Sequence, residues 1–140
     1  MIKNKVYYAK ANYGKSEISA VNKVLKHQRL NLMNSNNVKT FEKKIAKIFN
    51  KKYGLMVNSC SSANLLALSS LNLKPGSEVI TPCLTFSTTV SPIIQLGLKP
   101  VLIDITLDSL LIDVDKVEKM ISKKTKAIIV PNLIGNIPNL

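Results

Sequence analysis

The first fifty residues place apolar side chains with the period of an α-helix. In the segment SEISAVNKVLKH, residues 16–27, apolar positions recur every three or four residues, and Ser16 is available as a helix cap. The segment TFEKKIAKIF, residues 40–49, repeats this period after a polar loop. We therefore predict that residues 1–52 form an N-terminal helical segment with two amphipathic helices.

The pattern changes at residue 53. Four short apolar runs rich in β-branched residues follow, YGLMV, SEVIT, KPVLIDI and TKAIIV. They begin roughly 22 to 26 residues apart, which suits repeated strand-helix-strand units. Continuous apolar runs, in place of alternating ones, are typical of parallel strands buried on both faces. Residues 53–140 are therefore predicted to form an α/β domain with a mainly parallel sheet between layers of helices.

The stretch MVNSCSSANLLALSSL, residues 56–71, joins the first predicted strand to a helix through five small residues, 58–62. We expect this helix to begin at Ser61 or Ser62 and to turn four leucines toward the core. These are Leu65, Leu66, Leu68 and Leu71. Backbone amides at a helix start, beside the carboxyl end of a parallel strand, favour a phosphate. From the local sequence alone, a serine cap without a ligand is the simpler interpretation.

Composition and charge narrow the classes of partner. The net charge is +12, but Arg29 is the only arginine among the twenty basic residues. Lysine without arginine supplies charge and few paired contacts to phosphates or bases, so we expect a solvated surface and no nucleic-acid partner. The longest apolar stretches are broken by Pro92, Gly97 and Pro100, so we expect no membrane partner.

The cysteine and histidine content predicts no disulfide framework and no metal site. Cys60 and Cys83 have no second pair of cysteines to join, and His27 is the only histidine. A reducing cytoplasm is the expected location. We expect His27, near the end of the first helix, to be a solvated side chain.

Several motifs in fixed order resemble one enzyme family. These motifs are VNSCSSANLLAL, LKPGSEVITPCLTFSTTVSPIIQLGLKPVLIDI and LLIDVDKVEKMISKKTKAIIVPNLIGNIPN, preceded by segments similar to that family's opening helices. Together they cover residues 6–140 and are similar to the sugar aminotransferases, pyridoxal-phosphate enzymes of fold type I that act on nucleotide-linked keto sugars. The resemblance implies that residues 53–140 are the first half of the three-layer cofactor-binding large domain, which is truncated here.

The resemblance also implies roles for particular residues. The turn from Ser59 through Cys60 and Ser61 to Ser62 corresponds to the turn that holds the cofactor phosphate, although the family usually has glycine in place of Cys60. Phe86 occupies the position of the aromatic residue that stacks on the pyridine ring. Asn132 is expected near the active site.

Other residues receive no cofactor role from the resemblance. Asp104 is expected to be a structural group at a strand end, because the family's aspartate that pairs with the pyridine nitrogen lies beyond residue 140. A reactive thiol at Cys60 is an alternative interpretation, since a helix start lowers a thiol pKa. Passive substitution for glycine is the interpretation we favour.

The activity implied is transfer of an amino group from an amino acid to a nucleotide-linked keto sugar, with pyridoxal or pyridoxamine phosphate as cofactor and a homodimer as the assembly. A branch of the family instead removes a sugar hydroxyl, with histidine in place of the lysine that forms a Schiff base with the cofactor. A non-catalytic binding module is a third interpretation. The lysine or histidine lies beyond residue 140, so we expect no catalytic residue in this chain, which alone should be inert and marginally folded.

Overall fold

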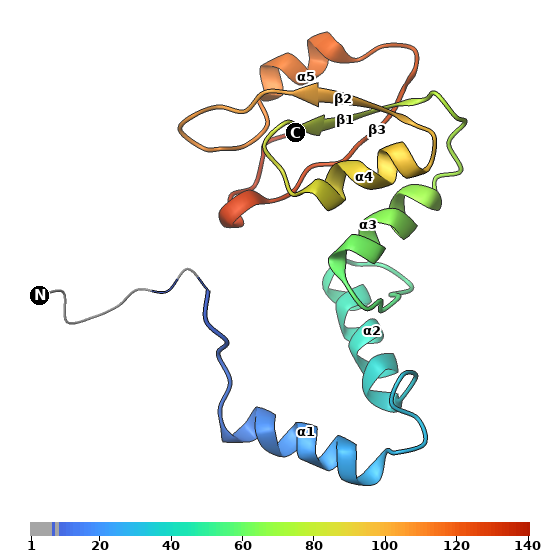
Figure 1. The fold of residues 1–140 in the computed structure, drawn as a ribbon, viewed down its shortest axis with the longest axis vertical. Helices are drawn as coiled ribbons and strands as arrows, with labels where there is room; N and C mark the ends of the chain where they lie inside the picture. Colours follow the sequence, from blue (N-terminus) through green and yellow to red (C-terminus); the bar gives the residue numbers. More distant parts are fainter. Residues whose placement is uncertain (1–6, 8) are drawn as a thin grey trace, which may run out of the picture. The chain divides into compact units, whose positions relative to one another are not determined.

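The chain divides into two compact units, between Met56 and Val57. The computed structural model describes Tyr7 and residues 9–140. The start of the predicted N-terminal helical segment, residues 1–6 and 8, lies outside the described residues. Figure 1 shows the elements of both units in the order in which they are described below.

The first unit contains two helices, α1 (Lys15–His27) and α2 (Asn36–Ile48). Gly14 occupies the cap position of α1, and its N–H donates to the Glu17 carboxylate at 2.6 Å. The predicted cap at Ser16 is therefore wrong, because the helix starts two residues earlier, where the Glu17 carboxylate bonds back to the Gly14 N–H. Helix α2 begins four residues before the predicted segment, since Ser35 stands at its cap position.

The predicted strand at residues 53–57 is absent. These residues lie along α2, where the Met56 N–H donates to the Glu42 carboxylate at 2.9 Å. Gly54 passes so close that a Cβ there would lie 2.6 Å from the Glu42 carbonyl oxygen. A strand needs a neighbouring segment that exchanges backbone hydrogen bonds with it along its length. No other described segment pairs with residues 53–57. The predicted strand is therefore wrong: the apolar run is in the sequence, but it pairs with no other described segment.

The second unit is built on a parallel sheet. Its strands are β1 (Glu78–Pro82), β2 (Lys99–Ile103) and β3 (Thr125–Ile128), in the order β2-β1-β3. Both neighbours of β1 run parallel to it, with Ile80 opposite Val101 on one side and Ile128 on the other. The helices between and before them are α3 (Cys60–Ser69), α4 (Ser87–Gln95) and α5 (Val114–Met120), and a 3-10 turn (Leu133–Gly135) follows. The predicted α/β fold with a parallel sheet is confirmed.

Alternation along β1 divides the core into two clusters. Val79 packs with Ile93 of α4 and Leu68 of α3 on one face, whereas Ile80 packs with Ile103 and Val117 on the face covered by α5. Figure 1 shows α4 and α5 on opposite faces of the sheet. Successive side chains of a strand point to opposite faces, so one strand buried on both sides produces this three-layer arrangement.

Only part of the leucine prediction for α3 is right. Leu68 is buried and Leu65 is half-buried, but Leu66 and Leu71 are about half exposed. Helix α3 contacts α4, and of these four leucines Leu68 alone is fully buried. In the part of the chain that the structure describes, no helix is both long and apolar enough to span a bilayer.

Adjacent isoleucines of α4 offer a test of this packing. Ile93 is fully buried against β1, whereas Ile94 is 63% exposed. We expect Ile93→Ala to lower the free energy of unfolding of the second unit by about 2–5 kcal/mol, because the sheet cannot collapse onto the space left. Ile94→Ala, the matched control, should change it by about 0.5 kcal/mol or less. Urea unfolding followed by the amide NMR signals of β1 measures both, and equal losses would contradict the layer arrangement.

Candidate functional site

The amino terminus of α3 leaves two backbone donors without a helical partner. Ser59 caps the helix, because its Oγ accepts from the Ser62 N–H at 3.2 Å and its carbonyl accepts from the Ala63 N–H at 3.1 Å. The helix therefore starts at Cys60, one residue before the predicted range. The N–H groups of Cys60 and Ser61 precede the first possible intrahelical bond and donate to no partner among the described residues.

The electrostatics of this helix start suit an anion. The first turn of α3 contains no acidic side chain, so nothing in it opposes a bound negative charge. The free amides and the positive end of the helix dipole point in the same direction. The Ser61 hydroxyl adds a further donor at the same turn.

The start of α4 presents an aromatic ring. Phe86 stands at the cap position directly before the helix and is 74% exposed. Its carbonyl accepts from the Thr89 N–H at 2.9 Å, and the Thr85 hydroxyl donates to the Thr89 hydroxyl at 2.9 Å. These two bonds hold the turn that carries the ring, while the ring itself remains available to a ligand.

One pocket of about 450 Å³ joins the two helix starts. Of the residues predicted from the sequence, Cys60, Ser61, Phe86 and Asn132 line it. Ser59 and Ser62 do not line it but form the cap that shapes its wall. The volume is in the range of small-molecule sites. The structure thus brings together four predicted residues from three separate segments.

Sequence reasoning missed other residues of the pocket wall. They are Asn64, Thr85, Thr88, Thr89, Pro131 and Leu133. The Asn64 side chain donates from Nδ2 to the Thr88 carbonyl at 3.2 Å and so connects α3 with α4. The available signal was helical spacing, because residue 64 lies four positions after Cys60 and faces the same side of the helix.

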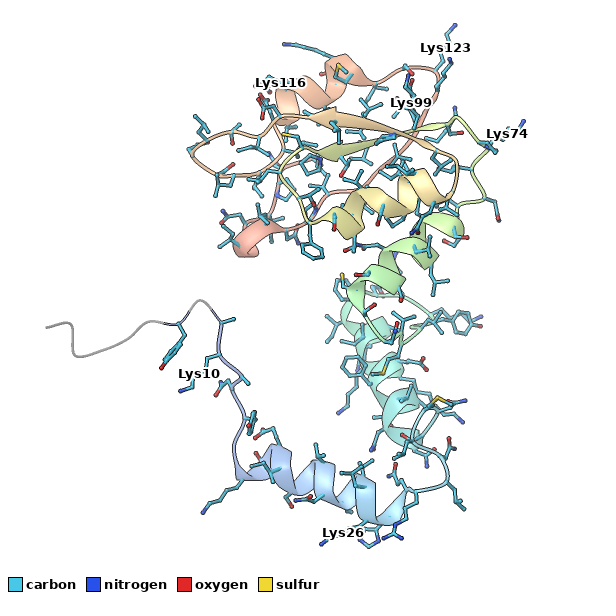
Figure 2. The ribbon with its side chains drawn as sticks, viewed as in Figure 1. Lys10, Lys26, Lys74, Lys99, Lys116 and Lys123 are labelled. Atoms are coloured by element: carbon cyan, nitrogen blue, oxygen red, sulfur yellow. The ribbon has the colours of Figure 1, made fainter. Side chains whose placement is uncertain are left out.

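The pocket holds hydrogen-bond donors, an aromatic face and the Cys60 thiol. No lysine, histidine or carboxylate is among the described residues that line it. Lys74, Lys99 and Lys123 instead lie at the edge of the sheet where the strands begin (Figure 2). The arrangement can bind a phosphate and a flat ring, but it offers no lysine to bond a cofactor covalently.

Asp104 lies outside the pocket, directly after β2. Its Oδ1 accepts from the Ile105 N–H at 2.9 Å and from the Cys83 thiol at 3.4 Å. These two donors, the backbone amide first, hold the pKa of the Asp104 carboxyl below its ordinary value. Both contacts are local to the strand end, which agrees with the expected structural role.

His27 lies in the first unit, as the last residue of α1, and is exposed. It lines a separate hollow of about 440 Å³ at the loop between α1 and α2. No phenylalanine, tyrosine or tryptophan and none of the predicted cofactor-binding residues is among the described residues that line this hollow. The chemistry expected from the sequence is therefore confined to the second unit.

Known proteins with similar sequence and structure identify the family. A 3-dehydratase for GDP-4-keto-6-deoxy-D-mannose from Yersinia pseudotuberculosis is 39% identical over 137 residues, covering 94% of this chain and 34% of that protein. The solved Escherichia coli GDP-4-keto-6-deoxy-D-mannose-3-dehydratase, with bound hydrated PLP, has a TM-score of 0.78 and 36% identity, covering 86% of this chain and 32% of the other. A protein described as a sugar aminotransferase from Streptococcus pneumoniae, in its PLP form, has a TM-score of 0.86 and 28% identity, covering 97% and 34%.

The chain spans about a third of the length of these relatives. Residues 11–140 match the DegT/DnrJ/EryC1/StrS aminotransferase family. The similarity therefore extends through both units and includes every predicted site residue. The chain belongs to the DegT/DnrJ/EryC1/StrS aminotransferase family, and it comprises the part of that family's PLP-dependent α/β fold that carries α3, α4 and the parallel sheet.

Proposed function

We propose that the pocket between α3 and α4 binds pyridoxal phosphate or pyridoxamine phosphate. The observation that carries this proposal is that the free amides at the start of α3 and the exposed ring of Phe86 line one pocket. The phosphate belongs at Cys60 and Ser61, held by backbone N–H groups and the Ser61 hydroxyl, with Ser59 and Ser62 shaping the turn. The pyridine ring belongs against Phe86.

The donors present fit these two parts of the cofactor. A phosphate needs several N–H or O–H donors, and the helix start supplies them without a cation. A flat conjugated ring gains from an aromatic face, because offset stacking is favourable beyond simple area burial. Asn132 lines the same pocket at the carboxyl end of β3, where its amide is available to a polar group of the cofactor or substrate.

We propose that the 140 residues alone bind the cofactor without turning over a substrate. When bound, the cofactor supplies an electron-withdrawing ring that stabilises negative charge developing on a substrate carbon. A proton must also be moved, and the described residues around the pocket offer no lysine, histidine or carboxylate for that task. The role of this chain is to hold the phosphate, orient the ring and cover one of its faces.

We propose that the whole protein acts on a nucleotide-linked keto sugar in surface-polysaccharide or deoxyamino sugar biosynthesis, and that the reaction is removal of the 3-hydroxyl. The 39% and 36% identity to GDP-4-keto-6-deoxy-D-mannose 3-dehydratases favours dehydration over the transamination expected from the sequence. Transamination is the second candidate, because the sugar aminotransferase from Streptococcus pneumoniae matches 97% of this chain with a TM-score of 0.86.

The partners proposed for the whole protein follow from this reaction class. They are a nucleotide-linked sugar, an amino acid that supplies the amino group, and a second copy of the protein in a homodimer. A reducing cytoplasm is the proposed location, because Cys60 and Cys83 are both free and exposed. The lysine charge is proposed to serve solvation, with no nucleic acid bound.

Alanine substitutions at the two ends of the pocket test cofactor binding. We expect Ser61→Ala and Phe86→Ala each to weaken binding of pyridoxamine phosphate by roughly three- to tenfold, through loss of a phosphate donor and of the stacking face. Phe49→Ala is the matched control, since Phe49 is also an exposed phenylalanine, at 68%, but lies in the first unit. Equilibrium dialysis of the full chain measures all three, and unchanged affinity in both pocket variants would refute the proposed site.

The Cys60 side chain can be tested where the family usually has glycine. Cys60 lies in the helical first turn of α3, and its side chain occupies the pocket wall. We expect Cys60→Gly to tighten binding of inorganic phosphate by roughly two- to fivefold, because the backbone can approach the anion more closely. The same change should lower helix stability by about 0.5–1 kcal/mol. Cys60→Ser, which keeps a Cβ, should not tighten binding, and calorimetric titration separates the two variants.

The reaction is decided in the whole protein that contains this chain. With a GDP-linked 4-keto-6-deoxy sugar and glutamate, we expect a 3-deoxy sugar nucleotide, 2-oxoglutarate and ammonia. Glutamate supplies the two electrons needed to replace the 3-hydroxyl by hydrogen, and its nitrogen leaves as ammonia. Retention of the amino nitrogen, seen by mass spectrometry after use of ¹⁵N-glutamate, would establish transamination instead. The residue at the family's lysine position, histidine or lysine, should agree with the product.

A further inference from the structure

Helix α4 contains a proline in its interior, at Pro92. Proline has no N–H, so the carbonyl four residues earlier cannot receive its intrahelical hydrogen bond. That carbonyl belongs to Thr88, the second residue of α4. Pro92 is fully buried in the layer between α4 and the sheet. The helix therefore carries one unpaired acceptor close to its amino terminus.

Asn64 of α3 supplies the missing donor. Its Nδ2 lies 3.2 Å from the Thr88 carbonyl oxygen, and both side chains are half-buried. A half-buried carbonyl without a partner is costly, so the orphaned acceptor and the asparagine amide stabilise each other. The bond that Pro92 removes from within α4 is thus replaced by a bond between two helices.

The position of this bond gives it a consequence for the pocket. Thr88 is two residues after Phe86, whose ring forms one wall of the pocket. Asn64 is one helical turn after Cys60, whose N–H lies at the other end. Asn64 and Thr88 themselves line the pocket between these two ends. A single hydrogen bond therefore joins the phosphate-binding turn to the turn that carries the ring.

We propose that Asn64 is a positioning residue for the cofactor, which fixes the start of α4 so that Phe86 meets the ring of a cofactor whose phosphate is held at α3. The inference deepens the proposed function and rests on it. Asn64 acts through Thr88 and Phe86 and needs no contact of its own with the cofactor. Pro92 is part of the device, because it frees the carbonyl that Asn64 engages.

A tie that serves stability alone makes a different prediction. Losing such a tie lowers the free energy of unfolding and leaves the ligand affinity of the folded chain unchanged. Loss of a positioning bond weakens the binding of ligands that stack on Phe86. It leaves unchanged the affinity for ligands that contact only the start of α3. Pyridoxamine phosphate and inorganic phosphate are probes of these two kinds.

The experiment is a double-mutant cycle on the full chain, with Asn64→Ala, Pro92→Ala and the combined variant. Alanine at residue 92 restores an N–H that can donate to the Thr88 carbonyl, so Asn64 becomes dispensable. With Pro92 present, we expect Asn64→Ala to weaken the binding of pyridoxamine phosphate by roughly three- to tenfold. With alanine at residue 92, the same change should weaken that binding by less than about twofold. The affinity for inorganic phosphate should change by less than about twofold in all three variants.

Two further variants complete the set. Asn64→Leu keeps the approximate shape of the side chain without a donor or a charge, so it should reproduce the loss seen with Asn64→Ala without leaving a cavity. Asn139→Ala is the control, because Asn139 is exposed and lies outside this pocket. NMR signals of the Asn64 side-chain amide follow the bond directly in the unmodified chain, and solvent-like exchange of those protons would overturn the inference.

The remaining outcomes separate this inference from the proposed function. Equal losses of pyridoxamine phosphate affinity in both residue-92 backgrounds overturn the role of Asn64 and leave the cofactor site standing. Coupling between residues 64 and 92 in urea midpoints, without any effect on ligand affinity, reduces the bond to a structural tie and also overturns the role. An unmodified chain that binds neither probe refutes the proposed function, and the positioning role falls with it.

Discussion

Parallel pairing of β1 with both of its neighbours is the constraint on which the rest of the second unit depends. Parallel strands cannot be joined by tight turns, so each connection must cross a face of the sheet, and α4 and α5 are these crossings. All carboxyl ends then meet at one edge. Phe86 follows β1 and Asn132 follows β3. Parallel pairing brings them to the same edge of the sheet, although 46 residues separate the strand ends at Pro82 and Ile128. The pocket is a consequence of strand direction.

The sequence predicted what local chemistry determines and missed what depends on a distant partner. Residues 78–82, 99–103 and 125–128 are strands as expected, because each is an apolar run with a neighbour available to pair. Residues 53–57 have the same kind of pattern, yet the Met56 N–H bonds to the Glu42 carboxylate instead of a strand. A hydrophobic pattern indicates that a segment can form a strand, whereas strand pairing also depends on a second segment. The exposed Leu66 shows the same limit, since helical spacing does not state how wide a face is covered.

The candidate site divides in the same way. Cys60, Ser61 and Phe86 were found because a run of small residues and an aromatic at a helix start are visible in the sequence, and resemblance to the family gave them roles. Their roles in cofactor binding stay predictions. Asn64 was missed because its partner is a backbone carbonyl, which no residue letter identifies. The sequence contains one indirect signal for it. Pro92 lacks an N–H and so leaves the Thr88 carbonyl without its intrahelical hydrogen bond. The fold is needed to show that Asn64 lies opposite this carbonyl.

Cys60 stands where the resemblance to the family implies glycine, but the local backbone does not require glycine there. Glycine is favoured where φ is positive, as at Gly76 and Gly97 in the turns before β1 and β2. Cys60 instead begins an α-helix, a conformation that every residue with a Cβ adopts readily, and it is exposed. Its side chain therefore costs the fold nothing and acts only on the space in front of two free amides. Replacing Cys60 by another residue with a Cβ should keep the helix start, whereas glycine also costs the helix about 0.5–1 kcal/mol. Comparing the two kinds of variant therefore separates an effect on the proposed anion site from an effect on stability.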